Sequence, residues 1–239
     1  MARSADLLDR LAEDPLRAAL FFDVDGVLAP IVSRPEDARV PEATRIELRR
    51  LNDRYALVAC ISGRAGDDAR RIVDVPELTY VGNHGLELDP EADAWAERLQ
   101  AFLATVDWAE LEDKRLSASL HYRRVEDEAA ARANLEAIAE RARAAGFVVR
   151  FGRKVLEVLP ALEANKGTAV RKLLAEHELE RALYAGDDTT DLDGFAAVEP
   201  LELSIRVAVA SAEGPEDLRA AADIVIDSPV ELFELLRRL

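Results

Sequence analysis

The sequence has few of the residues on which several classes of site depend. It contains a single cysteine, Cys60, inside the apolar run 57–61, so an internal disulfide and a cysteine metal cluster are both excluded. It has no stretch of 18 or more apolar residues, and its first residues lack the apolar core of a signal peptide. We therefore expect a soluble, cytoplasmic protein with no membrane partner.

Positive charge is also scarce. Thirty-one Lys and Arg stand against forty-seven Asp and Glu, which gives a net charge of −16. Such a surface repels nucleic acid and anionic lipid, so a phosphate-bearing substrate would need a local cationic site. The acidic excess is also compatible with a salty cytoplasm, which composition does not separate from ordinary solubility. Hydrophobic residues make up 49% of 239, enough for a substantial core.

Apolar runs that end in acidic or glycine-rich loops predict the fold. After a short leading helix over 7–16, the runs 18–22, 55–61 and 78–81 are typical of buried strands, and 41–53 has the pattern of an amphipathic helix between the first two. Repeated strand–loop–helix units favour an α/β fold with a doubly wound, Rossmann-like parallel sheet. Sites in such sheets lie at the carboxyl ends of the strands.

The pattern changes near residue 88, which indicates a second domain. From there the sequence alternates helices and strands in a smaller α+β unit, after which the strand–helix pattern of the core resumes. We predict a core of two segments, 1–87 and 162–239, interrupted by an inserted unit, 88–161. The expected elements of the insert and of the second core segment are helices over 95–106, 126–144 and 166–177 and strands over 116–123, 147–159, 183–185, 205–209 and 224–226.

Asp23 and Asp25 follow the first predicted strand, and Gly26 lets the chain turn sharply after them. Residues two apart at a strand end point to the same side, so both carboxylates should face the mouth of the sheet. One can attack phosphorus while the other gives a proton to the leaving oxygen, and a divalent cation can bridge the first carboxylate and the phosphate. An Asp-x-Asp loop alone is more often a simple turn.

A second acidic element, residues 186–191 (Gly-Asp-Asp-Thr-Thr-Asp), follows another apolar strand. Its three carboxylates are Asp187, Asp188 and Asp191. Mg²⁺ binds a few carboxylate oxygens together with water and substrate phosphate, so carboxylates from two strand ends make a plausible cage. An acidic helix N-terminus would explain one or two of these residues, but not all three beside an Asp-x-Asp loop.

Ser62 and Lys166 are the candidate phosphate-binding residues. Ser62 comes directly after the second predicted strand, and Lys166 lies in Asn-Lys-Gly at a predicted helix start. A lysine in the first turn opposes the helix dipole, which suggests a functional reason for its position. Only four of the thirty-one basic residues are lysines, so an ordinary solvated position would more often hold arginine.

In this order the motifs resemble those of the haloacid dehalogenase superfamily of phosphohydrolases. Receiver domains of response regulators share phosphoaspartate chemistry but are half this length. The motifs of residues 61–64, 81–87, 154–157, 165–167 and 186–191 are similar, more narrowly, to those of the trehalose-6-phosphate phosphatase family, and the likeness runs from about 21 to 195. It implies Mg²⁺-dependent hydrolysis of trehalose 6-phosphate.

The resemblance also assigns roles to the acidic residues. Asp23 would be the nucleophile, and Asp25 would protonate the departing sugar oxygen and then activate water. Asp23, the backbone carbonyl of Asp25 and Asp187 would hold Mg²⁺, and Asp188 and Asp191 would support these ligands. Preorganised positive charge is the main source of rate in phosphoryl transfer.

Five further residues are candidate substrate contacts. In the family the inserted unit is a cap that closes over the disaccharide, and Glu157 with Lys154 would line its sugar side. Arg64 lies in the Ser-Gly-Arg motif, His84 lies between two glycines, and Arg123 ends a predicted strand of the insert. Without the resemblance, Glu157 would be a solvated strand position, and a loop histidine satisfied by backbone is an equally good interpretation of His84.

Two positions depart from the family pattern. Val27 stands where threonine is usual after Asp-x-Asp-Gly, and Leu159 stands before Pro160 where a basic residue is common. The second departure bears on substrate identity more than on reaction type. A phosphatase of another sugar phosphate, such as sucrose or mannosylglycerate phosphate, and a phosphosugar mutase are the alternative enzymes. A noncatalytic sugar-phosphate sensor would have lost a catalytic group, and all are present.

The expected partner is therefore a small sugar phosphate, and no nucleic acid is expected. We expect a monomer. The resemblance also implies a functional link to a trehalose-6-phosphate synthase.

Overall fold

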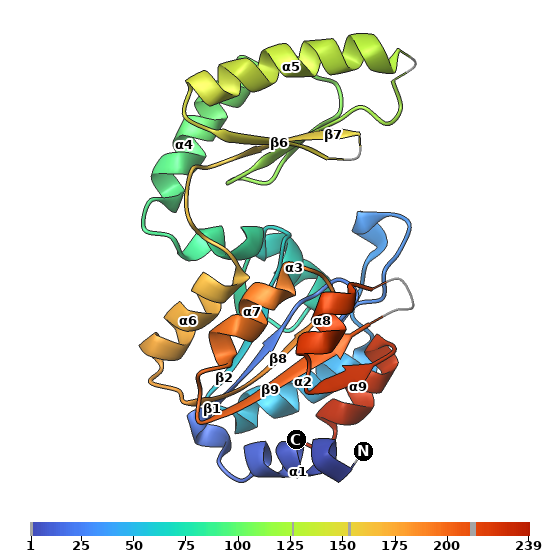
Figure 1. Ribbon diagram of the computed structural model, residues 1–239, viewed down its shortest axis with the longest axis vertical. Coiled ribbons are helices and arrows are strands. Elements are labelled where there is room, and N and C mark those ends of the chain that lie inside the picture. The colour runs from blue at the N-terminus through green and yellow to red at the C-terminus, as the bar shows by residue number, and fades with distance from the viewer. Residues whose placement is uncertain (1, 126, 153, 211–213) are drawn as a thin grey trace. The chain divides into compact units, whose positions relative to one another are not determined.

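The computed structural model describes residues 2–125, 127–152, 154–210 and 214–239, and the chain divides into two compact units (Figure 1). Unit 1 comprises Met1–Gly85 and Ala164–Leu239, and unit 2 comprises Leu86–Glu163. The strands are β1 (Ala18–Phe22), β2 (Leu57–Ile61), β3 (Thr79–Val81), β4 (Leu111–Asp113), β5 (Ala118–His121), β6 (Val148–Gly152), β7 (Val155–Leu159), β8 (Arg181–Gly186), β9 (Leu203–Val209) and β10 (Ile224–Ile226). The α-helices are α1 (Ala2–Ala12), α2 (Glu42–Arg54), α3 (Gly66–Val73), α4 (Ala92–Leu103), α5 (Glu128–Ala144), α6 (Lys166–Glu176), α7 (Asp191–Val198), α8 (Glu216–Ala221) and α9 (Pro229–Leu236), and the 3₁₀ helices are Pro15–Arg17, Pro35–Asp37 and Asn83–Leu88.

Unit 1 is built on a six-stranded sheet in the order β10-β9-β8-β1-β2-β3, with every neighbouring pair parallel. The two strands that the sequence marks as continuously apolar, β1 and β2, are buried at every position and lie side by side. Strands buried on both faces are typical of parallel sheets covered by helices. The predicted doubly wound parallel sheet is confirmed.

Alternation along β1 divides the core of unit 1 into two layers. Leu20 and Phe22 belong to a cluster that also contains the apolar side chains of α1, α2, α3 and α9. Phe21 points to the other face, where its ring lies near that of Tyr184. Tyr184 in turn makes an edge-on contact with Phe195 of α7, and α6 packs beside α7. Helices therefore cover both faces of the sheet.

The register of the sheet determines which loops meet at its carboxyl edge. Phe22, the last residue of β1, pairs with Cys60 of β2 and with Ala185 of β8. β2 and β8 each continue one residue past these partners, so the residues that follow the three strands start within one residue of the same level. They are Asp23 after β1, Ser62 after β2 and Asp187 after β8.

Unit 2 is a four-stranded antiparallel sheet in the order β4-β5-β7-β6, with α4 and α5 packed on one face. Leu120 of β5 and Leu156 of β7 point into the core formed with these helices, which includes Trp95 and Leu135. The predicted separate α+β unit is confirmed as an element of the fold. Its role as a cap remains a prediction.

Two helices lie elsewhere than predicted: α4, expected over 95–106, runs Ala92–Leu103, and the leading helix differs more. It was expected over 7–16, but α1 runs Ala2–Ala12 and a 3₁₀ turn follows at Pro15–Arg17. Proline removes a backbone donor and fits only the first turn of a helix, so the α-helix ends before Pro15 and a separate 3₁₀ turn begins there.

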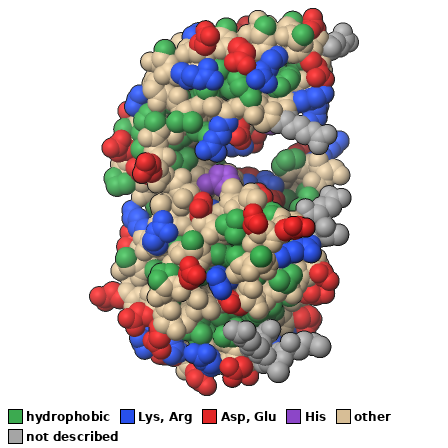
Figure 2. Space-filling model, viewed as in Figure 1, with side chains coloured by type: hydrophobic (Ala, Val, Ile, Leu, Met, Phe, Trp, Pro, Cys, Tyr) green, Lys and Arg blue, Asp and Glu red, His purple; other side chains and the backbone are tan. Residues whose placement is uncertain are grey.

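Within the described ranges, no helix is long and apolar enough to cross a membrane. On the face shown in Figure 2, acidic and basic side chains are interspersed.

Candidate active site

Asp23 occupies the first position after β1, and its backbone continues the sheet by donating to the carbonyl of Ala185 (3.0 Å). The residue is 7% exposed. Its Oδ1 accepts the backbone N–H of Val24 (2.6 Å), and its Oδ2 accepts Lys166 Nζ (2.6 Å). Gly26 then turns the chain at a φ of 76°, a conformation that L side chains rarely adopt. The nucleophile predicted from sequence is thus a fixed, nearly buried carboxylate.

Lys166 is the first residue of α6 and is 1% exposed. The preceding Asn165 caps the helix through a reciprocal pair of hydrogen bonds with Thr168, which fixes where the helix begins. From there the ammonium reaches Asp23 and also donates to Asp191 Oδ1 (2.7 Å). Burial alone would lower the pKa of Lys166, but the two carboxylates outweigh it and raise that pKa. Lys166 therefore stays cationic.

Asp191 opens α7 and is completely buried. Its Oδ1 also accepts the hydroxyl of Tyr184 (2.8 Å), and its Oδ2 accepts the backbone N–H groups of Asp187 and Asp188 (3.0 Å each). With Lys166, four donors surround this carboxylate. An ionised carboxylate has about four acceptor sites, so these donors can satisfy all of them. The arrangement fits a residue that shapes the loop and orients Lys166.

Asp23, Asp187 and Asp191 each place a carboxylate oxygen within 4.8 Å of the others. Burial raises the pKa of Asp187 to about 8, with further repulsion from Asp23 and Asp191. Burial likewise raises the pKa of Asp23 to about 7, although Lys166 opposes this increase. Carboxylates crowded in this way are stabilised as anions by a cation among them.

The donor set fits a hard divalent cation. The four contacts of Asp191 leave Asp23 and Asp187 as the better direct ligands, and in the described part of the chain no donor hydrogen-bonds to the Asp187 carboxylate. A Cβ added at Gly26 would lie 2.0 Å from Asp187 Oδ2, so glycine is needed for this carboxylate to approach the Asp23 loop. Oxygen ligands of this kind suit Mg²⁺ or Ca²⁺.

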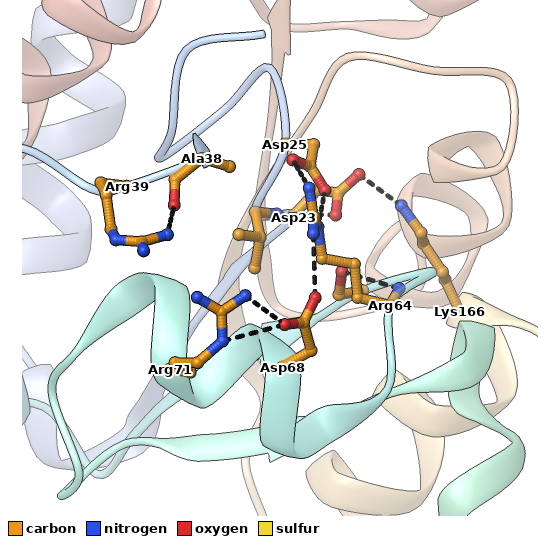
Figure 3. Close-up of polar contacts among 10 residues, drawn as sticks. Asp23, Asp25, Ala38, Arg39, Arg64, Asp68, Arg71 and Lys166 are labelled. Carbon is orange, nitrogen blue, oxygen red and sulfur yellow. Dashed lines mark hydrogen bonds and ion pairs between the residues drawn. The ribbon is translucent and has the colours of Figure 1, made fainter. Parts of the chain in front are cut away.

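A second group of charges lies beside Asp23, as Figure 3 shows. Arg64 holds Asp25 through two hydrogen bonds and also binds Asp68 of α3. Ser62 is 1% exposed, and its hydroxyl oxygen accepts the backbone N–H of Arg64 (3.2 Å). Among the described residues the Ser62 hydroxyl has no acceptor, so its hydrogen can be donated to a phosphate oxygen.

The loop after β3 supports the same region. Asn83 donates its backbone N–H to the carbonyl of Arg64 (2.7 Å), and His84 donates its own to the carbonyl of Ser62 (2.8 Å). Both residues have a positive φ, near 51° and 55°. The His84 side chain is exposed. These contacts give the loop a structural role, and substrate contact by His84 stays a prediction.

The other predicted substrate contacts belong to unit 2. Glu157 of β7 is half-buried and lies in a cross-strand row between Ser119 of β5 and Arg150 of β6. Lys154 precedes β7 and forms an ion pair with Glu128 of α5. Arg123, after β5, is exposed. Their contact with a sugar stays a prediction.

Asp68 and Tyr184 are parts of the site that the sequence reasoning missed. Asp68 lies in the first turn of α3, four residues after Arg64, which precedes the helix; an acid at this spacing from an arginine was the available signal. Tyr184 lies inside an apolar strand and gives no signal beyond its hydroxyl, which must find a partner once it is buried.

The chain matches the family model for trehalose-phosphatase over residues 21–108 and 90–224, which contain the carboxylates, Ser62, Arg64 and Lys166 of the unit 1 site. It is 33% identical to a trehalose-phosphate phosphatase of Mycobacterium marinum over 93% of this chain. The chain spans 61% of the length of that relative.

Solved structures of similar fold include a phosphatase of the same family name. The fold is similar to that of a trehalose-6-phosphate phosphatase of Aspergillus fumigatus, with a TM-score of 0.61 and 25% identity over 98% of this chain and 96% of that one. It is also similar to a haloacid dehalogenase-like hydrolase of Bacteroides thetaiotaomicron, with a TM-score of 0.59 over 92% of this chain and 98% of that one. At 15% identity the second likeness concerns the fold alone.

Proposed function

The chain belongs to the trehalose-phosphatase family, and on this premise we propose that it hydrolyses trehalose 6-phosphate to trehalose and inorganic phosphate. The observation that carries the proposal is the buried cluster at the carboxyl edge of the unit 1 sheet. There a carboxylate, Asp23, is fixed by the cationic Lys166 beside a second carboxylate, Asp187, in a position that suits a cation. This arrangement suits attack on a phosphate monoester.

In the proposed mechanism an Asp23 oxygen attacks phosphorus, and the bond to the sugar oxygen breaks as Asp25 gives that oxygen a proton. Water then attacks phosphorus of the acyl phosphate as Asp25 accepts a proton from that water, and the bond between phosphorus and the Asp23 oxygen breaks. The products are trehalose and phosphate, and Asp23 is regenerated. Lys166 and Ser62 would bind the phosphate oxygens, since both lie at the same edge of the sheet as Asp23. Their charge and hydroxyl would stabilise the transferring group.

Asp23 and Asp187, with the backbone carbonyl of Asp25, would hold Mg²⁺, and Asp188 and Asp191 would support that site. When bound, Mg²⁺ supplies positive charge that favours the anionic form of Asp23 and neutralises phosphate oxygens. The raised pKa values of Asp23 and Asp187 support this proposal, because a cation would relieve the repulsion that contributes to them.

We further propose that unit 2 determines substrate choice. Glu157 supports this proposal, since it is a half-buried acid on the sheet of a unit whose described residues contribute nothing to the carboxylate cluster. A half-buried carboxylate is well suited to accept hydrogen bonds from sugar hydroxyls. Binding energy from such remote contacts can raise the rate of the chemical step.

The test is phosphate release from a panel of trehalose, sucrose, glucose and mannosylglycerate phosphates, with Mg²⁺ added. We expect trehalose 6-phosphate to give the highest kcat/KM. Preference for another member would refute the substrate while leaving the phosphatase intact, and isomerisation without release of phosphate would identify a mutase. The control is Asp23→Asn, which keeps shape but cannot attack phosphorus. Turnover by a clean preparation of that variant would refute the phosphoaspartyl route.

A further inference from the structure

Arg64 holds Asp25 by both of its oxygens (Figure 3). Arg64 Nε donates to Asp25 Oδ2 at 2.6 Å, and Arg64 Nη2 donates to Asp25 Oδ1 at 2.8 Å. Paired hydrogen bonds of this kind fix the direction of a carboxylate as well as its place. In the described part of the chain, Arg64 is the only residue that hydrogen-bonds to the Asp25 carboxylate.

Arg64 is itself braced on the side away from Asp25. Its Nη1 donates to Asp68 Oδ2 at 2.9 Å, and its side chain is only 17% exposed. Asp68 also accepts hydrogen bonds from Arg71 through Oδ1. Burial alone would raise the pKa of Asp68, but the bonds from Arg64 and Arg71 outweigh it and lower that pKa. Asp68 is therefore an anion that anchors the guanidinium.

The backbone of Arg64 is fixed from within its own loop after β2 and from the loop after β3. Its N–H donates to the Ser62 hydroxyl oxygen at 3.2 Å, and its carbonyl accepts the N–H of Asn83 at 2.7 Å. The guanidinium thus extends from a fixed point toward a loop carboxylate whose side chain is 40% exposed. An exposed loop side chain such as that of Asp25 has rotamer freedom, and the paired hydrogen bonds from Arg64, here called the clasp, remove it.

We propose that Arg64, braced by Asp68, is the positioning residue that aims Asp25 for proton transfer. The inference rests on the proposed function, since it presumes that Asp25 carries the proton. It gives Arg64 a role other than the substrate contact that its motif predicts. The two hydrogen bonds occupy two of about four acceptor sites on the carboxylate, so a site remains on each oxygen for the proton. Each of the three guanidinium nitrogens of Arg64 donates a hydrogen bond to a carboxylate of the protein.

The test is a double-mutant cycle on kcat and KM with the preferred sugar phosphate. Arg64→Met keeps an unbranched stem but donates nothing, and it is measured in the wild-type and Asp25→Asn backgrounds. In the wild type we expect kcat to fall by about 10- to 100-fold with KM changed by less than about 2-fold, because small displacements of a catalytic group have effects of this size. In Asp25→Asn the same change should lower kcat by less than about 3-fold, because the two residues act as one unit.

Two further variants make the result specific. Arg64→Lys restores one hydrogen bond and should recover part of kcat, but not all of it, because an ammonium lacks the paired donors. Arg71→Met removes the arginine that binds Asp68 from the exposed side, and it should keep kcat within about 2-fold, since its ion pair is half-exposed. Asp68→Asn removes the anchor but leaves the clasp, and serves if Arg64→Met does not fold. We expect it to lower kcat by a smaller factor, again only where Asp25 is present.

Two outcomes would overturn the proposal. A rise in KM of the same size in both backgrounds would make Arg64 a substrate contact, and an equal loss of kcat in both backgrounds would make its role structural. Both results are obtained on an enzyme that releases phosphate, so they refute the role of Arg64 while leaving the proposed function in place. That proposal fails separately, if wild type releases no phosphate from any sugar phosphate or if Asp23→Asn remains active.

Discussion

Replacing Lys166 with methionine tests whether buried charge pairs hold the carboxyl edge of the unit 1 sheet together. Lys166 Nζ lies 2.6 Å from Asp23 Oδ2 and 2.7 Å from Asp191 Oδ1, and the residue is 1% exposed. Methionine occupies most of the space of the stem but donates no hydrogen bond. Two charged hydrogen bonds of about 1.5–3 kcal/mol each are lost, and two buried carboxylates lose their cation. Breaking one side of a buried pair costs about 3–5 kcal/mol, which we expect here.

The assay is thermal unfolding of the metal-free protein. For a chain of this size about 1 kcal/mol corresponds to roughly 2–4 °C, so Lys166→Met should lower Tm by about 6–20 °C. Lys172→Met is the matched control, since it changes the same residue type in the same helix. The Lys172 side chain is 42% exposed, and its Nζ lies 3.9 Å from Glu176 Oε1. An exposed pair of this kind contributes less than about 1 kcal/mol, so Tm should change by less than about 4 °C.

The stability deficit of Lys166→Met should also grow as the pH rises above neutral. In the wild type, burial raises the pKa of Asp23 to about 7 although Lys166 opposes it. Without Lys166 that pKa lies higher still. A carboxyl whose folded-state pKa is raised stabilises the protein at low pH, and this contribution is lost as the pH rises to the folded-state value. Above about pH 7 the variant therefore still loses stability through Asp23, whereas in the wild type the contribution of Asp23 is already lost. Asp187, whose pKa is about 8, adds a loss of stability up to about pH 8 in both proteins. A deficit equal to that of Lys172→Met, or one that shrinks above neutral pH, would refute the reasoning.

Three further predictions concern the metal, the packing and the sugar. Asp187→Asn should abolish the rise in Tm that Mg²⁺ gives the wild type, and that rise should be larger at about pH 8 than at about pH 6, because metal binding requires the deprotonated carboxylate and the pKa of Asp187 is about 8. Gly194→Ala should lower the free energy of unfolding by about 1–3 kcal/mol in a denaturant titration, because the added Cβ would lie 2.3 Å from Tyr184 Cζ; unchanged stability would show that the ring can move aside. Glu157→Ala should reduce kcat/KM for trehalose 6-phosphate by about 1–3 kcal/mol while barely changing hydrolysis of an aryl phosphate, and equal losses on both would indicate a structural role.

The parallel sheet was predictable because two of its neighbouring strands, β1 and β2, are short, continuously apolar runs. The run that forms β1 is buried at all five positions, and each such run ends where a polar loop begins. Because parallel strands end at one edge, Asp23, Ser62 and Asp187 could be expected together before any register was known. The helix start at Lys166 followed from the asparagine before it. The extent of α1 was harder to predict, since its apolar pattern runs on to the 3₁₀ turn at Pro15.

The direction of the Arg64 side chain was not predictable in this way. The motif Ser-Gly-Arg gives the residue and the strand end, and a substrate contact was a reasonable expectation for a cation beside a phosphate site. Its two partners lie 39 residues upstream and four residues downstream. The pairing with Asp25 depends on the β1–β2 register and on the loop that follows each strand. Sequence order alone does not place those two side chains opposite one another.

The roles of the acidic residues in the loop after β8 were also not predictable from sequence order alone. The sequence identifies Asp187, Asp188 and Asp191 as a group but gives no reason, apart from the family resemblance, to separate ligands from supporting residues. The separation comes from counting donors. Asp191 receives four hydrogen bonds and is buried completely, whereas Asp188 is exposed and accepts from Thr189 next to it. Asp187 is half-buried beside Asp23 and has a raised pKa. In the described part of the chain, no hydrogen-bond donor contacts its carboxylate. Of the three, it is therefore the carboxylate with both the need for a cation and the open oxygens to bind one.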